Sequence, residues 1–140
     1  MAVRNPVKSM SHVVFVCEHG AAKSVLAATY FNHFAERFGL SMRAVARGTS
    51  PDLEVPPTVV DGLARAGLAP CTRAPTALAP EDFDDAARVI TFDQPQVATL
   101  APLPDRVLSW NDLPPVSADF GVARDAIIAR VQALIVALRG

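Results

Sequence analysis

Cys17 and the loop that follows it form the part of this sequence best suited to chemistry. Cys17 comes directly after the apolar, β-rich run 13–16, and Lys23 and Ser24 close the loop. Between them lie Glu18, His19, Gly20, Ala21 and Ala22. The small residues allow successive backbone N–H groups to turn toward one point, and such a nest binds an oxyanion. We therefore expect residues 18–23 to bind phosphate or arsenate, and Cys17 to be a thiolate nucleophile.

The residues around this loop strengthen its attraction for an anion. The predicted helix that follows supplies unpaired N–H groups and the positive end of its dipole, which favour both an anion and a thiolate. Gly20 can adopt a positive φ without steric cost. Lys23 adds a full positive charge, and the Ser24 hydroxyl can donate to the sulfur of Cys17.

Two aspartates follow later predicted strands. Asp93 comes after the run 88–92, and Asp112 comes after the run 106–110. Because ligands of parallel sheets bind at the carboxyl ends of strands, both aspartates can converge on Cys17. Asp112 is the better candidate for a general acid, since phosphoryl transfer to a thiolate requires a proton for the leaving oxygen. Asp93 either lines the pocket or caps the helix that follows it.

The elements that must position these residues alternate along the chain. Short β-rich runs predict strands over 13–16, 41–46, 88–92 and 106–110. Apolar residues at helical spacing predict helices over 22–38, from Pro56 to a stop at Gly67, and over 123–138. Such alternation implies right-handed crossovers between parallel strands. The expected fold class is α/β, a single-domain three-layer sandwich in which a four-stranded parallel sheet is flanked by helices.

Length and composition indicate one globular domain. The 140 residues suffice for one core but not for two ordinary domains. Hydrophobic residues make up 51% of the chain and charged residues 19%, which is typical of a globular protein and not of a disordered one. The pattern that could be buried begins at His12, so we expect a flexible leader over 1–11 and the domain over 12–140.

Charge and hydropathy exclude several classes of partner. The net charge is −1, and no Lys/Arg run with interleaved aromatics is present, so we expect no binding to nucleic acid. The longest apolar stretch, 126–138, is interrupted by Arg130 and Gln132 and is shorter than the roughly 20 residues of a membrane span. The two cysteines do not form a disulfide framework, and the start lacks an export signal. A cytoplasmic location is therefore predicted.

No metal or other cofactor is expected. His12, His19 and His33, taken with Cys17, lack a recognisable ligand spacing. His19 is instead expected to face solvent or substrate. Arg47 either reaches the loop from the second strand or is a surface charge.

The run VFVCEHGAAKS resembles the opening of the low-molecular-weight protein tyrosine phosphatases and the related arsenate reductases. Their signature is a cysteine, five residues, then arginine and serine, directly after a first strand. Arg47-Gly48-Thr49 is similar to the family's Ser-Ala-Gly-Thr stretch. Trp110-Asn111-Asp112-Leu113-Pro114 is similar to its late loop, which carries an acidic residue before a proline. The resemblance thus extends over most of the chain in the family's order.

Two residues depart from the family's signature. Lys23 stands in place of the arginine, and Gly20 in place of the asparagine that steadies the loop. Arginine holds two oxyanion oxygens with a planar fork, whereas lysine is a compact point charge. Anion binding can therefore survive without rapid catalysis.

The resemblance implies hydrolysis of a phosphomonoester, a protein phosphotyrosine being one such substrate, through a cysteinyl-phosphate intermediate. Cys17 attacks, Lys23 and the loop amides hold the oxygens, Ser24 steadies the thiolate, and Asp112 protonates the leaving group. Two alternatives remain open: an arsenate reductase that uses a small thiol, and a non-catalytic oxyanion-binding module. A thioredoxin-coupled reductase is disfavoured, because no resolving cysteine stands near the third strand and Cys71 lies elsewhere.

Overall fold

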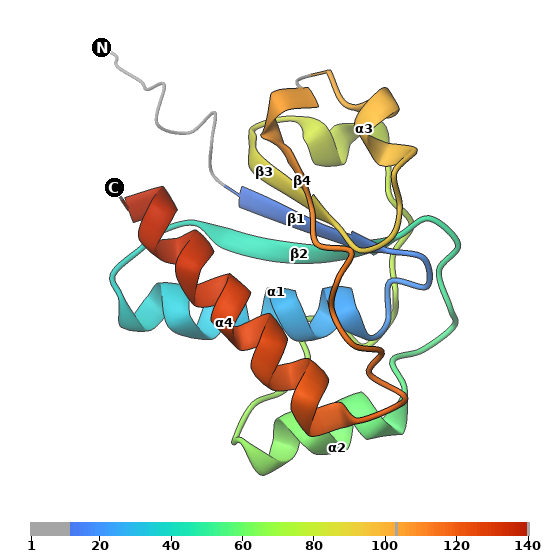
Figure 1. The fold of residues 1–140 in the computed structure, drawn as a ribbon, viewed down its shortest axis with the longest axis vertical. Coiled ribbons are helices and arrows are strands. Elements are labelled where there is room, and N and C mark those ends of the chain that lie inside the picture. The colour runs from blue at the N-terminus through green and yellow to red at the C-terminus, as the bar shows by residue number, and fades with distance from the viewer. Residues whose placement is uncertain (1–11, 103, 140) are drawn as a thin grey trace.

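A four-stranded parallel sheet forms the centre of the protein (Figure 1). The computed structural model describes residues 12–102 and 104–139, so the predicted leader, 1–11, lies outside the described residues. The strand order is β2-β1-β3-β4. The strands are β1 (His12–Cys17), β2 (Arg43–Gly48), β3 (Ala86–Thr91) and β4 (Val107–Ser109). The predicted α/β class with a four-stranded parallel sheet is confirmed.

Helices of very different length cover the two faces of the sheet (Figure 1). On one face, α1 (Lys23–Arg37) packs against the strands and against α4 (Phe120–Arg139), and α2 (Pro57–Arg65) contacts α4. The other face carries shorter elements, which are α3 (Val97–Leu100) and the 3₁₀ turns η2 (Pro80–Phe83) and η3 (Pro104–Arg106). None of the helices within 12–102 and 104–139 is both long and apolar enough to cross a membrane.

The helix limits follow from glycine and proline at the predicted positions. After α1 the chain turns through Gly39, whose φ of 73° is accessible to glycine at little cost. The helix α2 begins with Pro57 in its first turn, where the missing N–H would have no intrahelical partner anyway. Gly67, with φ of 75°, follows the end of α2.

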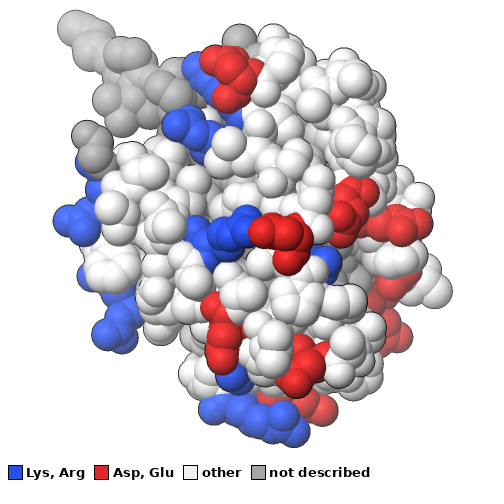
Figure 2. Space-filling model, viewed as in Figure 1, with Lys and Arg blue, Asp and Glu red and all other residues white. Residues whose placement is uncertain are grey.

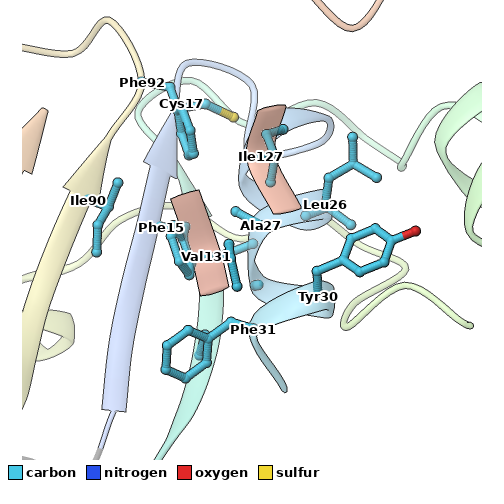
Figure 3. Packing of buried hydrophobic residues seen from close by; sticks show 14 of the residues in the cluster. Phe15, Cys17, Leu26, Ala27, Tyr30, Phe31, Ile90, Phe92, Ile127 and Val131 are labelled. Carbon is cyan, nitrogen blue, oxygen red and sulfur yellow. The ribbon is translucent and has the colours of Figure 1, made fainter. Parts of the chain in front are cut away.

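Aromatic side chains pack together on the face of the sheet that α1 and α4 cover (Figure 3). Phe15 is fully buried in the middle of β1. Its ring lies 6.1 Å from that of Phe31 on α1, 6.2 Å from that of Phe92 after β3 and 5.8 Å from that of Trp110 after β4. Truncating a buried Phe to Ala typically costs about 3–5 kcal/mol, so this cluster is a major source of stability. It also fixes the ends of three strands relative to one another.

The opposite face of β1 has a smaller core. Val14 and Val16 point away from α1 and pack with Val89 of β3 and Val97 of α3. Alternation along the strand thus divides β1 between two hydrophobic layers, as a central strand requires. The short α3 contributes only one fully buried residue, Val97, to this second layer.

The carboxyl ends of the strands lie along one edge of the sheet. In the β1–β2 pair Cys17 stands opposite Gly48. The β1–β3 pairing continues one step further, because the amide of Phe92 donates to the carbonyl of Val16 at 2.8 Å. The loops after β1, β2, β3 and β4 therefore begin next to one another, and Cys17 is at their centre.

Candidate active site

The peptide groups after Cys17 all turn in the same direction. The carbonyls of residues 17, 18 and 19 accept hydrogen bonds from backbone amides of the loop after β2. These bonds join Thr49 N to Cys17 O (3.2 Å), Ser50 N to Glu18 O (2.7 Å) and Asp52 N to His19 O (3.0 Å). In a trans peptide the N–H points opposite to the C=O, so the N–H groups of residues 18, 19 and 20 face away from this loop. They are therefore available to an anion on the other side of the segment.

These N–H groups have no hydrogen-bond acceptor within residues 12–102 and 104–139. Among the described residues, no backbone or side-chain oxygen accepts from the N–H groups of residues 18–22. Backbone donors are seldom left without an acceptor unless solvent or a ligand reaches them. Their availability is consistent with the predicted nest, which stays a prediction.

Two glycines allow the loop to take this shape. Gly20 has φ of 62°, as predicted, and a Cβ on it would come within 2.8 Å of the Gly48 nitrogen. A Cβ on Gly48 would come within 2.7 Å of the Gly20 nitrogen. The two backbones therefore touch directly, and neither position admits a side chain without movement. Gly20 thus supplies the conformation but no side-chain hydrogen bond.

Cys17 lies at the bottom of the nest, at the start of α1. Its side chain is 8% exposed, and its Sγ is 3.0 Å from the Oγ of Ser24. Figure 3 shows the sulfur at the end of β1, directed toward the loop that leads into α1. The Ser24 hydroxyl can donate to a thiolate at this distance, and the helix dipole favours negative charge at the same place.

A cavity of about 490 Å³ opens above Cys17. The nest residues Cys17–Lys23, except Gly20, form its floor. One wall comes from the β2–α2 segment and contains Asp52, Pro56, Thr58 and Val59. The opposite wall comes from the loops after β3 and β4 and contains Phe92, Asp93, Gln94, Pro115, Val116 and Ser117.

Lys23 reaches across the cavity to this opposite wall. Its side chain is 16% exposed, and its Nζ lies 3.4 Å from the carbonyl oxygen of Leu113 and 3.7 Å from Oδ2 of Asp93. An ammonium group has three donors, so these contacts leave capacity for an oxyanion. Lys23 therefore combines a structural contact with a place in the pocket lining.

The backbone of Asp93 is held in an unusual conformation. Its φ is 60°, which is uncommon for a residue other than glycine. Its amide donates to Oδ1 of Asn111 at 2.8 Å, and its carbonyl accepts from Nε2 of Gln94 at 2.8 Å. The helix α3 begins four residues later, with Gln96 at its N-cap and no side-chain cap bond. The carboxylate therefore lines the pocket and does not cap α3.

Asp112 does not reach the pocket. Its carboxylate accepts two hydrogen bonds from Nη2 of Arg130, at 2.6 and 2.7 Å, and it is absent from the cavity lining. The Arg130 guanidinium also lies over the ring of Trp110, 5.8 Å from its centre. The hydrogen bonds from Arg130 lower the pKa of Asp112, which favours its ionised form. Its predicted role as proton donor stays a prediction, one that this placement does not support.

Carboxylates gather at the mouth of the pocket. Figure 2 shows acidic side chains over the loops on the right of the view, where the strands end, and basic ones on the opposite side. Three acidic residues line the pocket, Glu18, Asp52 and Asp93. His19 also lines the pocket, and its Nδ1 lies 3.1 Å from Oδ1 of Asp52.

Two other polar residues lie away from the pocket. Arg47 donates to Asp82 at 3.0 and 3.1 Å and is not a pocket residue, so it does not reach the loop after β1; it is a partly buried ion-pair partner rather than a simple surface charge. The backbone amide of Cys71 donates to the Thr29 hydroxyl, and Cys71 is also absent from the lining. Although part of Cys71 reaches solvent, burial raises the pKa of its thiol.

Several pocket residues had no signal in the sequence. Asp52, Thr58 and Val59 belong to a segment that reads as a loop and a helix start, and Val116 and Ser117 lie in a loop without a motif. The one usable clue was topological: the loop after β2 must begin beside Cys17 if β1 and β2 are neighbours.

This arrangement defines a class of small α/β proteins in which a cysteine lies in a loop of backbone amides at the start of a helix. The family model described as low molecular weight phosphotyrosine protein phosphatase matches residues 12–112. The chain therefore belongs to this family, which confirms the resemblance drawn from its motifs. No curated protein sequence matches it.

Solved structures share the fold at low sequence identity. A mutant of YwlE from Bacillus subtilis superposes with a TM-score of 0.80 and is 20% identical over 92% of this chain and 99% of its own. YfkJ from Bacillus subtilis gives a TM-score of 0.79 and 18% identity, with 94% and 96% covered. An arsenate reductase from Archaeoglobus fulgidus gives 0.67 and 25% identity, with 88% and 98% covered.

Proposed function

We propose that the protein hydrolyses phosphomonoesters through a cysteinyl-phosphate intermediate on Cys17. The observation that carries this proposal is the set of backbone N–H groups of residues 18–20, which face away from the loop after β2 because the preceding carbonyls bind that loop. Preorganised donors of this kind stabilise the charge on the oxygens of a transferring phosphoryl group. Membership of a phosphatase family supports the same reaction.

Each group of the nest has a role in the proposed reaction. The Cys17 thiolate attacks phosphorus and the bond from phosphorus to the ester oxygen breaks, while Ser24, 3.0 Å away, stabilises the thiolate before attack and after release. The backbone donors and Lys23 hold the non-bridging oxygens. Water then attacks the phosphorus, the P–S bond breaks and inorganic phosphate leaves.

The pocket mouth favours some phosphate esters over others. Glu18, Asp52 and Asp93 surround the nest with carboxylates, of which Asp52 contacts the His19 ring and Asp93 the Lys23 ammonium. A substrate with further negative groups beside its phosphate would be repelled. We therefore propose substrates whose phosphate stands beside neutral or basic groups. One structural neighbour, YwlE, is described as an arginine phosphatase, so a phosphorylated arginine belongs in the substrate panel.

Arsenate reduction is the second candidate. The nest suits any tetrahedral oxyanion, and arsenate reductases are among the proteins of the same fold. Because Cys71 does not line the pocket, a thiol that resolves an arsenic adduct on Cys17 would have to come from another molecule.

We also propose that the protein works in a reducing compartment such as the cytoplasm, since Cys17 must remain a free thiol for either reaction.

One experiment separates these functions. The protein is assayed with an aryl phosphate, with phosphoarginine, and with arsenate plus a small thiol, and phosphate binding is measured on the same sample. Release of inorganic phosphate that is lost in Cys17→Ser supports the proposal. Thiol oxidation that depends on arsenate, without ester hydrolysis, would assign the second function. Phosphate binding with neither reaction would identify a binding module.

A further inference from the structure

A phosphatase of this design needs a proton donor, and the pocket supplies a small set of candidates. Ester oxygens leave as alkoxides or phenoxides unless an acid protonates them. Asp112 lies outside the pocket and is bound to Arg130. Within the described residues, the acidic groups of the pocket lining are Glu18, Asp52 and Asp93, together with the imidazole of His19.

Position separates these candidates. Glu18 and His19 belong to the nest itself, on the side from which the loop amides hold the phosphate. Asp52 is engaged with the His19 ring at 3.1 Å. Asp93 comes from the opposite wall, one residue after the last backbone contact between β1 and the β3 segment. Its side chain is 58% exposed at the mouth, where a leaving group must depart.

The backbone at Asp93 is held by contacts with neighbouring side chains. Its left-handed conformation, which Asp85 shares, is one that aspartate adopts more readily than most residues. Here Asn111 holds the amide and Gln94 the carbonyl, each at 2.8 Å. Gln94 is itself 9% exposed and accepts from the Thr49 hydroxyl at 2.7 Å. These contacts therefore hold Asp93, which lines the cavity, on a rigid support.

On the basis of the proposed phosphatase function, we propose that Asp93 is the catalytic acid and base of this pocket. In the first step the Cys17 sulfur bonds to phosphorus, the bond from phosphorus to the leaving oxygen breaks, and that oxygen takes the proton of the Asp93 carboxyl. In the second step the Asp93 carboxylate takes a proton from water, the water oxygen bonds to phosphorus, and the P–S bond breaks to restore the thiolate. Ester and water become alcohol and phosphate, with no change of oxidation state.

Lys23 connects this carboxyl to the nest. In the free pocket its ammonium lies 3.7 Å from Oδ2 of Asp93. A phosphate in the nest is a new anionic partner for Lys23, on the same side of the pocket as this carboxyl. Lys23 therefore links the occupied nest to the residue proposed to transfer the proton.

The test is the dependence of turnover on the leaving group. The parent protein, Asp93→Asn and Asp61→Asn are compared on aryl phosphates that range from nitrophenyl to unsubstituted phenyl phosphate. Asparagine tolerates positive φ, so Asp93→Asn keeps the backbone and removes only the acid. Asp61 is an exposed aspartate of α2 outside the pocket and is the matched control.

We expect Asp93→Asn to lower kcat/KM, which covers the steps up to release of the alcohol, about 10²–10⁴-fold for phenyl phosphate and much less for nitrophenyl phosphate, which needs little protonation. Asp61→Asn should match the parent on every substrate. An equal loss of kcat/KM across all substrates would show that Asp93 has a structural role, while parent turnover would still uphold the phosphatase function. A selective loss in Asp112→Asn or His19→Asn, with Asp93→Asn unaffected, would assign the acid elsewhere. A parent protein inactive on every ester would overturn both proposals.

Discussion

The loop after β1 and the loop after β4 face the same pocket but are specified in opposite ways. In the first, backbone contacts decide the shape: three carbonyls bind the loop after β2, and Gly20 touches Gly48. In the second, side chains decide it, since Asp112 turns outward to Arg130 and the guanidinium lies over Trp110. The first loop is fixed by backbone contacts with the loop after β2, whereas the second depends on the side chain of one residue of α4.

This difference explains which chemistry can be inferred from each loop. A nest made of backbone donors tolerates changes of side chain, so the replacement of arginine by Lys23 leaves its donors in place. A side chain that must point into a pocket has no such protection. One ion pair with Arg130 is enough to place Asp112 outside. Pro115, Val116 and Ser117 form this part of the wall instead.

The largest expected effect follows from removing the nucleophile. Cys17→Ser should abolish turnover and leave phosphate binding within about twofold of the parent, because the donors belong to the backbone. Turnover by steady-state kinetics and binding by calorimetry check both halves. If Cys17→Ser also loses phosphate binding, the sulfur and not the backbone dominates the site.

A second prediction concerns the glycine contact beneath the nest. Gly20→Ala should destabilise the fold by about 3 kcal/mol, because it combines a positive φ with overlap on the Gly48 backbone. Gly39→Ala is the matched control: its φ is 73° and nothing lies within 4 Å of the added Cβ, so about 1 kcal/mol is expected. Urea unfolding measures both. Equal losses would mean that the two loops do not touch as described.

Lys23 is expected to have an intermediate effect. Lys23→Ala should weaken phosphate binding by about tenfold, which is the size of one charge-assisted hydrogen bond. Lys23→Arg should raise kcat/KM on the order of tenfold, provided that the longer side chain keeps the contact with the carbonyl of Leu113. Phosphate inhibition and kcat/KM are measured for the three proteins together. No change in Lys23→Ala would remove Lys23 from the set of anion ligands.

The smallest effect belongs to the second loop. Asp112 has a lowered pKa in the folded state, so its pairing with Arg130 stabilises the fold above about pH 4 and ceases to do so as the pH falls through the lowered pKa. Asp112→Asn should therefore lower Tm slightly at pH 7 and leave it unchanged once the pH is well below the lowered pKa of Asp112. A pH-independent difference in Tm would contradict the pairing. The Arg130→Ala variant should give the same result at pH 7.

Most of the fold could be predicted from local sequence patterns. The four strands and the three long helices are present, with ends shifted by a few residues, because continuous apolar runs and glycine or proline stops act locally. The predicted strand 41–46 is Arg43–Gly48 in the structure, and 88–92 is Ala86–Thr91. The sequence did not predict how thin the layer on the α3 face of the sheet is, since the four-residue helix α3 is too short to show a helical period of apolar residues.

The site divides in the same way. Cys17, Ser24 and the positive φ of Gly20 could be predicted, because their geometry depends on neighbours in sequence. The direction of Asp112 could not, because its partner is 18 residues away on α4. The sequence leaves open whether Asp93 lines the pocket or caps the next helix. Only the contacts of its backbone with Asn111 and Gln94 distinguish these two roles.

Trapping the intermediate tests the central claim most directly. The protein is mixed rapidly with an aryl phosphate, quenched in denaturant at neutral pH and digested, and the masses of the peptides that contain Cys17 and Cys71 are measured. We predict a phosphoryl group on the Cys17 peptide during turnover, and none on the Cys71 peptide, whose thiol is outside the pocket. Formation of product while Cys17 stays unmodified at every time point would contradict the account.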